Sequence, residues 1–350
     1  MERDVVAVYD ERGPQWAALR TAVRADDARA FGASVVGLRA DVGCGAGRYL
    51  GELGAPVVGF DASATMLRLA GEAVPGAMLV QADLEALPFR DRSLAGAWAN
   101  MAYLHVPRPR LPLALARLHL ALRVGAPLDL QVLAGDFDWD VLADDDVPGR
   151  KFAGWPVDRL VDVVVGAGFS VEATVTGDGW VRVRATRLRT LPDTVGPGMR
   201  VLICGLNPSE YSADRGVGFA RRSNRFWGAA VEAGLVSKPF DTLHALTVDG
   251  VGMTDMVKRA TVASRELSRD EYREGAARVE RLVQWLRPRV VCFVGLEGWR
   301  AALNRSAVAG WQPQDFGGVP AYVMPSTSGL NASASRTALA AHLRAIRGPE

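Results

Sequence analysis

The strongest constraint on the fold is that two complete alternations of apolar strands and amphipathic helices follow each other in the chain. Residues 191–198 separate them and read LPDTVGPG, a composition that interrupts both helices and strands. Alternation of this kind is typical of mostly parallel sheets with helices on both faces. Because 350 residues exceed one ordinary core, we predict two α/β domains, residues 1–190 and residues 191–350.

Charge and hydropathy limit the classes of protein that fit. Residues 1–190 carry 21 Lys and Arg against 24 Asp and Glu, a net charge of −3, whereas residues 191–350 carry 20 against 15, a net charge of +5. The second domain is therefore the better candidate to meet phosphates. The sequence lacks any run of about 18 uncharged apolar residues, which predicts no membrane span. A charged N-terminal segment without an apolar stretch predicts a cytoplasmic protein.

Cysteine content excludes another class of site. Cys44, Cys204 and Cys292 are too few and too widely separated for a disulfide framework or a four-ligand cluster. An iron–sulfur cluster held by four cysteines is thereby excluded. We expect Cys204 and Cys292 to be buried in strands, and we predict no metal site.

The loop after the first strand of the second domain carries residues suited to chemistry. An apolar run at 201–204 ends at Gly205, which predicts a buried strand followed by a tight loop. Asn207 precedes Pro208, which keeps the backbone of Asn207 extended and its side chain on a stiff turn. A neutral amide at this place can orient a water molecule but cannot take its proton.

The same loop continues through two glycines to an aromatic residue and a run of arginines. Gly216 and Gly218 allow close backbone approach before Phe219, and Ser223-Asn224 predict the start of a helix near Arg225. Two interpretations of the arginines remain open, namely phosphate contacts or a solvated start of the helix. These arginines are Arg221, Arg222 and Arg225.

The order Gly-Leu-Asn-Pro, a glycine-rich loop with an aromatic residue, and Asn-Arg-Phe-Trp resembles the mismatch-specific uracil-DNA glycosylases of the uracil/thymine-DNA glycosylase superfamily. Two further segments match in the order of that family, GMTDMVKRAT at 252–261 and YVMPSTSGLNA at 322–332. The resemblance covers residues 191–350 and implies an α/β/α glycosylase fold without a cofactor. Its substrate would be double-stranded DNA that contains a mismatched or damaged pyrimidine.

The resemblance also implies residue roles. Asn207 would position the attacking water, Phe219 would stack on the extruded base, and Ser212 and Ser326 would contact that base. The residues that would fill the vacated place in the DNA stack are Gly329, Leu330 and Asn331, with Leu330 as the apolar wedge. Because Asn207 is not a base, we expect a slow enzyme that favours stable leaving groups. Since mismatched bases cost less to extrude, we expect it to prefer G·U to A·U pairs. An arginine that the bacterial family often has is replaced by Ala332.

The first domain contains a glycine-rich loop at the end of its first predicted strand. Asp41 precedes Gly43, Gly45 and Gly47, but the third glycine of a dinucleotide-binding GxGxxG is absent, which argues against NAD. The next predicted strand, 56–60, is followed by Asp61, and an acid there can bind ribose hydroxyls. A third predicted strand at 78–81 leads to Asp83.

With two more strands and a closing hairpin, this pattern resembles class I S-adenosylmethionine-dependent methyltransferases over residues 1–190. The resemblance implies that Asp41 and the three glycines lie against the methionine part of S-adenosyl-L-methionine. Asp61 would hold the ribose, and Asp83 would lie near the adenine. A degenerate fold that kept its glycines for packing is the alternative.

The methyl acceptor stays unknown. The fourth predicted strand is followed by Asn-Met-Ala-Tyr, not by the Asn/Asp-Pro-Pro-aromatic sequence of amino-methylating DNA methyltransferases, and a Pro-Cys nucleophile is also absent. His105 could act as a base near the acceptor or be structural. We interpret the acidic run that follows as a solvated loop or lid. Its members are Asp136, Asp138, Asp140, Asp144, Asp145 and Asp146.

Three hypotheses remain open at the level of sequence. The first is a glycosylase for mismatched uracil fused to a methyltransferase-like domain, cytoplasmic and associated with the nucleoid when bound to DNA. The second is a methyltransferase of a small molecule or protein with a C-terminal nucleic-acid-binding module. The third treats both halves as binding scaffolds. The sequence leaves the oligomeric state and the choice among uracil, thymine and ethenocytosine open.

Several elements are predicted with definite bounds. A helical pattern covers 15–31, a hairpin covers 170–176 and 180–188, and buried strands cover 290–294 and 321–324. Ser268 and Glu271 form a capping-box pattern before a helix that Pro288 ends.

Overall fold

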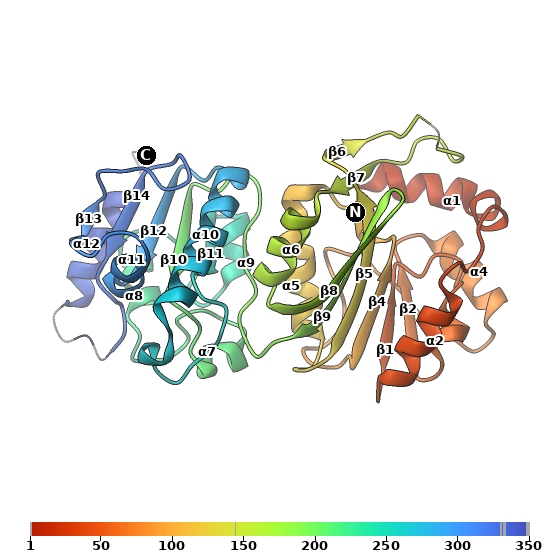
Figure 1. Cartoon of the computed structure of the whole chain (residues 1–350), viewed down its shortest axis with the longest axis horizontal. Coiled ribbons are helices and arrows are strands. Elements are labelled where there is room, and N and C mark those ends of the chain that lie inside the picture. The colour runs from red at the N-terminus through yellow and green to blue at the C-terminus, as the bar shows by residue number, and fades with distance from the viewer. Residues whose placement is uncertain (1, 144, 330, 332–333, 348–350) are drawn as a thin grey trace. The chain divides into compact units, whose positions relative to one another are not determined.

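A computed structural model describes residues 2–143, 145–329, 331 and 334–347 (Figure 1). The chain divides into two compact units, residues 1–165 with 169–188, and residues 166–168 with 189–350. The boundary predicted at 190/191 lies beside this division. Both units are α/β, as predicted. Among the described helices, none combines the length and apolar character needed to cross a bilayer.

The first unit is built on a nine-stranded sheet whose main path runs β3-β2-β1-β4-β5-β7-β6. The strands are β1 (Arg39–Val42), β2 (Val57–Asp61), β3 (Met78–Gln81), β4 (Gly96–Asn100), β5 (Pro127–Ala134), β6 (Phe137–Asp140), β7 (Phe152–Trp155), β8 (Phe169–Gly177) and β9 (Trp180–Arg187). The strands β1 to β5 and β7 pair in parallel, while the predicted hairpin β8–β9 joins β5 antiparallel. The carboxyl ends of β1, β2 and β4 therefore meet at one edge.

Helices surround this sheet. They are α1 (Arg3–Ala18), α2 (Ala25–Ser34), α3 (Leu50–Leu53), α4 (Ala64–Ala73), α5 (Leu111–Ala121) and α6 (Val157–Gly166), with short 3-10 helices at Tyr103–His105 and Arg108–Arg110. Helix α1 packs against α4, and α2 packs against α3.

The continuous helix predicted at 15–31 is wrong, because α1 ends at Ala18 and α2 begins at Ala25. Arg24, the residue before α2, is buried and turns its side chain toward the sheet. It donates to Asn100 Oδ1 at 2.9 Å and to Asp129 Oδ1 at 2.8 Å. Helical periodicity does not report such a buried polar contact with residues far along the chain.

The second unit has a five-stranded sheet in the order β11-β10-β12-β14-β13. Its strands are β10 (Val201–Gly205), β11 (Val251–Asp255), β12 (Val290–Val294), β13 (Gly310–Trp311) and β14 (Ala321–Met324). All neighbours are parallel except β13 and β14. The strands predicted at 290–294 and 321–324 are confirmed.

Helices cover both faces of this second sheet. They are α7 (Glu210–Arg215), α8 (Phe226–Glu232), α9 (Thr242–Thr247), α10 (Arg269–Leu286), α11 (Leu296–Ala302) and α12 (Arg336–Ile346), with a 3-10 helix at Ser264–Glu266. On β12, Cys292 lies in one core cluster with Phe226 and Leu339, while the ring of Phe293 contacts those of Trp299 and Phe316 on the other side. The capping box at the start of α10 is present as predicted.

Candidate active sites

The loop that follows β10 is paired along its length with the segment that follows β11. Leu206 O accepts a hydrogen bond from Val257 N at 3.0 Å, and Pro208 O accepts one from Thr261 N at 3.2 Å. The parallel pairing of β10 with β11 therefore continues beyond the sheet edge into both loops. This extension fixes the loop that carries Asn207.

The side chain of Asn207 is oriented by two acceptors on the neighbouring segment. Its Nδ2 donates to Arg259 O at 2.9 Å and to Thr261 Oγ1 at 2.8 Å. Because the carbonyl of Arg259 can only accept, the amide nitrogen must face it. Both amide hydrogens are then engaged, and among the described residues Oδ1 has no partner. The free oxygen can accept a hydrogen bond from a water molecule.

Phe219 lies near the carboxyl end of β10 and has a strained backbone. Its φ is 56°, a left-handed conformation that costs about 1–3 kcal/mol for a residue of this size. One face of its ring stacks on Phe226 with 4.2 Å between centroids and 22° between planes. The ring edge lies 3.5 Å from the place where a Cβ on Gly205 would stand, and Asp255 Oδ1 lies 2.3 Å from that place. The absence of a side chain at Gly205 therefore brings Phe219 and Asp255 together.

Ser212 and Ser326 are both engaged in local hydrogen bonds. Ser212 is buried, and its Oγ contacts Ser209 Oγ at 3.1 Å and accepts from Ala220 N at 3.4 Å. Ser326 Oγ accepts from Ser328 N at 3.3 Å. Ser212 follows the Asn207 loop and Ser326 follows β14, so both lie beyond strand ends, where ligands of parallel sheets bind.

The loop that carries the predicted DNA wedge is held by Arg225. Its guanidinium donates to the carbonyl oxygens of Ser328 at 2.7 Å and Asn331 at 2.5 Å, and also to that of Ala334. Gly329 packs so closely that a Cβ there would lie 2.8 Å from Ser223 O. Leu330, the predicted apolar wedge, lies outside the described residues, as does Ala332.

A buried ionic cluster supports the segment that holds Asn207. Asp193 Oδ1 accepts from Lys258 Nζ at 2.8 Å and from Thr254 Oγ1 at 2.6 Å, and Asp193 Oδ2 accepts from Arg278 at 2.7 Å. Burial alone would raise the pKa of Asp193, but Arg278 and Lys258 outweigh it and hold that pKa below its usual range. Sequence reasoning missed this cluster, because its members are 61 to 85 positions from Asp193.

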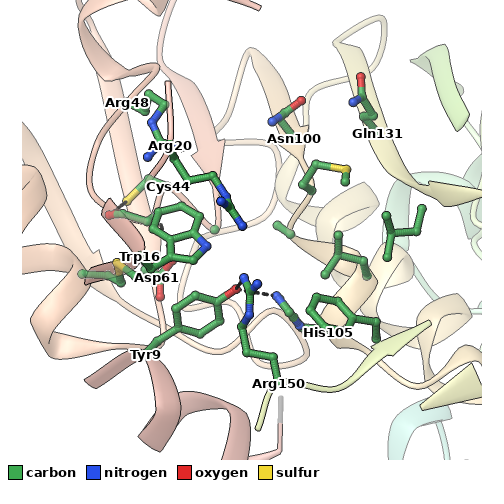
Figure 2. Close-up of a pocket in the computed structure, with 18 of the residues that line it drawn as sticks. Tyr9, Trp16, Arg20, Cys44, Arg48, Asp61, Asn100, His105, Gln131 and Arg150 are labelled. Carbon is green, nitrogen blue, oxygen red and sulfur yellow. Dashed lines mark hydrogen bonds between the residues drawn. The ribbon is translucent and has the colours of Figure 1, made fainter. Parts of the chain in front are cut away.

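The first unit contains a cavity of about 820 Å³ at the carboxyl edge of its sheet (Figure 2). Of the predicted cofactor residues, Asp41, Gly43, Gly45 and Asp61 line it. Gly47 and Asp83 are not among the described residues of its wall. A Cβ on Gly47 would lie 2.9 Å from Ala70 Cα, so Gly47 lets the loop pack on α4, and Asp83 Oδ1 accepts from Glu85 N at 2.9 Å.

Two carboxyl groups in this cavity differ in their partners. Asp61 accepts from Gly45 N at 3.0 Å and from Ser63 N at 2.9 Å. Asp41 is almost fully buried, and its Oδ2 has no hydrogen-bond partner in the part of the chain that the structure describes. Burial first, and then the charge of Asp61, raise the pKa of Asp41 to about 8. A positive charge bound beside them would favour the ionised form of Asp41, so the two groups fit a ligand with a positively charged part, as S-adenosyl-L-methionine has.

In the same cavity, Tyr9, His105 and Arg150 point toward one another (Figure 2). His105 Nδ1 lies 2.9 Å from the carbonyl of Lys151 and must donate to it, so Nε2 accepts from the Tyr9 hydroxyl at 2.7 Å. Arg150 donates to Tyr9 Oη at 3.1 Å. Burial lowers the pKa of His105 to about 4 and raises that of Tyr9 to about 12. His105 is therefore neutral at pH 7 and lines the cavity.

The acidic run between β5 and β7 is not simply a solvated loop. The side chain of Asp145 is 2% exposed and pairs with Arg150, and Asp136 pairs with Arg108. The interpretation of this run as a solvated loop did not include either arginine. Arg108 lies 28 positions before Asp136 in the chain. Across the described residues, no group of His, Cys, Asp and Glu has the arrangement to hold a metal ion. Cys204 and Cys292 are free and buried, as expected.

Two family models match the chain. Residues 192–347 match the uracil DNA glycosylase superfamily, and residues 40–125 match a methyltransferase domain. The chain joins a uracil DNA glycosylase superfamily domain to a methyltransferase domain. The glycosylase superfamily, the methyltransferase family and the fold class predicted for the two domains are thereby confirmed.

Solved structures similar to this chain include several methyltransferases. An S-adenosylmethionine-dependent methyltransferase from Methanosarcina mazei is 21% identical over 43% of this chain and 92% of its own, with a TM-score of 0.38. Another from Mesorhizobium loti is 21% identical over 47% and 98%, with a TM-score of 0.40. The 1,6-didemethyltoxoflavin-N1-methyltransferase of Burkholderia thailandensis is 18% identical over 52% and 85%, with a TM-score of 0.42.

Proposed function

We propose that the glycosylase domain hydrolyses the N-glycosidic bond of uracil in G-mismatched DNA, with thymine and ethenocytosine as further candidate bases. The observation that carries this proposal is the orientation of Asn207. Its amide nitrogen is held by Arg259 O and Thr261 Oγ1, which leaves Oδ1 to orient a water molecule. Glycosidic cleavage passes through an oxocarbenium-like sugar, to which such a water can add.

The other residues of the site support a base-excision reaction. Phe219 has one face against Phe226 and would stack on an extruded pyrimidine, while Ser212 and Ser326 would meet its polar edge. Gly329, Leu330 and Asn331 would fill the gap in the DNA stack. Since the amide of Asn207 cannot take a proton from the water, departure of a stabilised uracil anion has to provide most of the rate. The domain needs no cofactor for this reaction.

Replacing Asn207 by Ala is expected to lower the single-turnover excision rate on a G·U duplex by at least about 100-fold, because the water loses its orienting acceptor. Excision is measured by alkaline cleavage of a labelled strand, and duplex binding is measured beside it. Binding should change little. Asn304→Ala serves as the control, since Asn304 lies in an exposed turn after α11. A variant at Asn207 that cuts as fast as this control would refute the role.

For the methyltransferase domain, we propose that the cavity binds S-adenosyl-L-methionine, which supplies an electrophilic methyl group when bound. Asp41 and Asp61 with the glycine loop would hold it, and the Tyr9, His105 and Arg150 side would face the methyl acceptor. The observation that supports cofactor binding is Asp41 Oδ2, which is buried and has no hydrogen-bond partner among the described residues. A methyltransferase acting on a small molecule or protein, with the second domain as a nucleic-acid-binding module, is the second candidate function. We place the protein in the cytoplasm, bound to the nucleoid when it engages DNA.

Asp61→Ala is expected to weaken S-adenosyl-L-methionine binding by at least about 10-fold, because each lost charge-assisted hydrogen bond is worth about 1.5–3 kcal/mol. Isothermal calorimetry on the full chain measures the affinity. Glu72→Ala is the matched control, since Glu72 pairs with Arg68 on the exposed side of α4. No measurable affinity in the unaltered protein would rule out the cofactor.

A further inference from the structure

The surface of the glycosylase domain carries a group of arginines around one tyrosine. Tyr211 on α7 is 37% exposed. The guanidinium carbons of Arg215 and Arg221 lie 5.5 Å and 5.6 Å from the centroid of its ring. Arg222 is the next residue and is also exposed. We call Tyr211, Arg215, Arg221 and Arg222 the arginine patch.

The arginine patch lacks negative charge of its own. In the described part of the chain, none of its three guanidinium groups contacts a carboxylate. The nearby acids of α7 are engaged elsewhere, because Glu210 and Asp214 both pair with Arg189, at 3.1 Å and 2.6 Å. Like charges gathered without a counter-charge repel each other. Such a cluster is stabilised when an anion binds to it.

The patch borders the proposed base site directly in the chain. Tyr211 precedes Ser212, and Arg221 follows Phe219 by two positions. Ser212 Oγ also accepts a hydrogen bond from Ala220 N, which ties the two segments together beside the patch. An anion on the patch would therefore lie next to a base held against Phe219.

We propose that the arginine patch binds the phosphates of the DNA strand that carries the extruded nucleotide, next to that nucleotide. The two guanidinium groups lie against one ring, and a DNA strand carries one phosphate charge per nucleotide, so a short stretch of strand can supply an anion to each. Tyr211 keeps both side chains directed to the same place through cation–π contacts. This inference rests on the proposed function for the identity of its partner.

The test measures binding apart from excision. The full chain carrying Asn207→Ala, which binds without cutting, is titrated by fluorescence anisotropy against one labelled duplex with a G·U pair and one without, over a range of salt concentrations. Arg215→Gln with Arg221→Gln should reduce the slope of log affinity against log salt by about 2, since each phosphate contact contributes about 0.9. The loss should be the same on both duplexes.

Two further variants separate the patch from general effects. Arg273→Gln removes an exposed arginine paired with Asp270 on α10 and should leave the salt slope unchanged. Tyr211→Phe should keep the affinity, while Tyr211→Ala should weaken it, because only the ring is needed to orient the arginines.

Each outcome decides the proposal. An unchanged salt slope in the double variant overturns it, and so does a loss seen only with single-stranded RNA, which would assign the patch to another nucleic acid. A chain that binds DNA through the patch without excising any base would sustain this inference while the proposed glycosylase reaction failed. If the protein excises uracil but the double variant keeps the salt slope, the proposed glycosylase reaction stands and the inference about the arginine patch fails.

Discussion

Replacing Asp193 by Ala is expected to lower the free energy of unfolding of the glycosylase domain by about 3–5 kcal/mol. The carboxylate is 2% exposed and is the counter-charge of two buried cations, Lys258 and Arg278. Removing it leaves both positive charges in a medium that solvates them poorly. A domain of this size is stable by roughly 5–15 kcal/mol, so the loss takes a large share of that stability.

The measurement follows the domain within the full chain. Amide hydrogen exchange of β10 and β11, read by mass spectrometry, reports the opening of this sheet without contributions from the other domain. Asp193→Asn keeps an acceptor but not the charge and should give an intermediate effect. Asp270→Ala removes the exposed partner of Arg273 and should change stability by no more than about 1 kcal/mol. Equal exchange in the Asp193→Ala and Asp270→Ala variants would contradict the prediction.

The same cluster explains why Asn207 is held so firmly. Lys258 lies on the segment whose Arg259 carbonyl and Thr261 hydroxyl bind the Asn207 amide. In the proposed excision reaction, Asp193 would act only as a positioning residue, by fixing Lys258. Its loss should therefore slow excision even where the domain remains folded.

The sequence predicted that Asn207 lies in the loop after a buried strand. It did not predict the acceptors that orient the Asn207 amide. An apolar run ending at Gly205 and an Asn-Pro pair are local signals, which a sequence displays directly. The acceptors that orient the amide are 52 and 54 positions away and become neighbours only through the parallel pairing of β10 with β11. The segment at 252–261 was recognised by resemblance, but nothing in its residues told which of them would face Asn207.

In the first domain, too, local signals were predictable and contacts between distant residues were not. Asp41, Gly43, Gly45 and Asp61 were found because a glycine loop and acids at strand ends recur at fixed places along such a fold, and all four line the cavity. Tyr9 was not found. Its contact with His105 joins residues 96 positions apart, and the helix that carries Tyr9 was predicted to begin only at residue 15.

Asp255 gives the second large prediction, a change of stability with pH. Burial, as the largest cause, raises its pKa from the ordinary 3.8 to about 6, and none of the described groups donates a hydrogen bond to its carboxylate. Between these values the folded protein holds a proton that the unfolded chain has released. Stability therefore falls as pH rises from about 4 to 6 and stays reduced above that. The full shift corresponds to about 3 kcal/mol at 1.36 kcal/mol per pKa unit.

Asp255→Asn should recover this loss, because an amide cannot ionise. We expect the variant to exceed the unaltered protein in stability by about 1–3 kcal/mol at pH 7.5, the lower figure allowing for the partial exposure of the side chain. At pH 4, where Asp255 is protonated in the folded state, the two should be nearly equal. Hydrogen exchange of β11 at the two pH values, corrected for intrinsic rates, measures the difference. If Asp255→Asn is more stable by the same amount at both pH values, packing and not ionisation is the cause. Asp249→Asn is the control, since it removes a charge near the other end of β11.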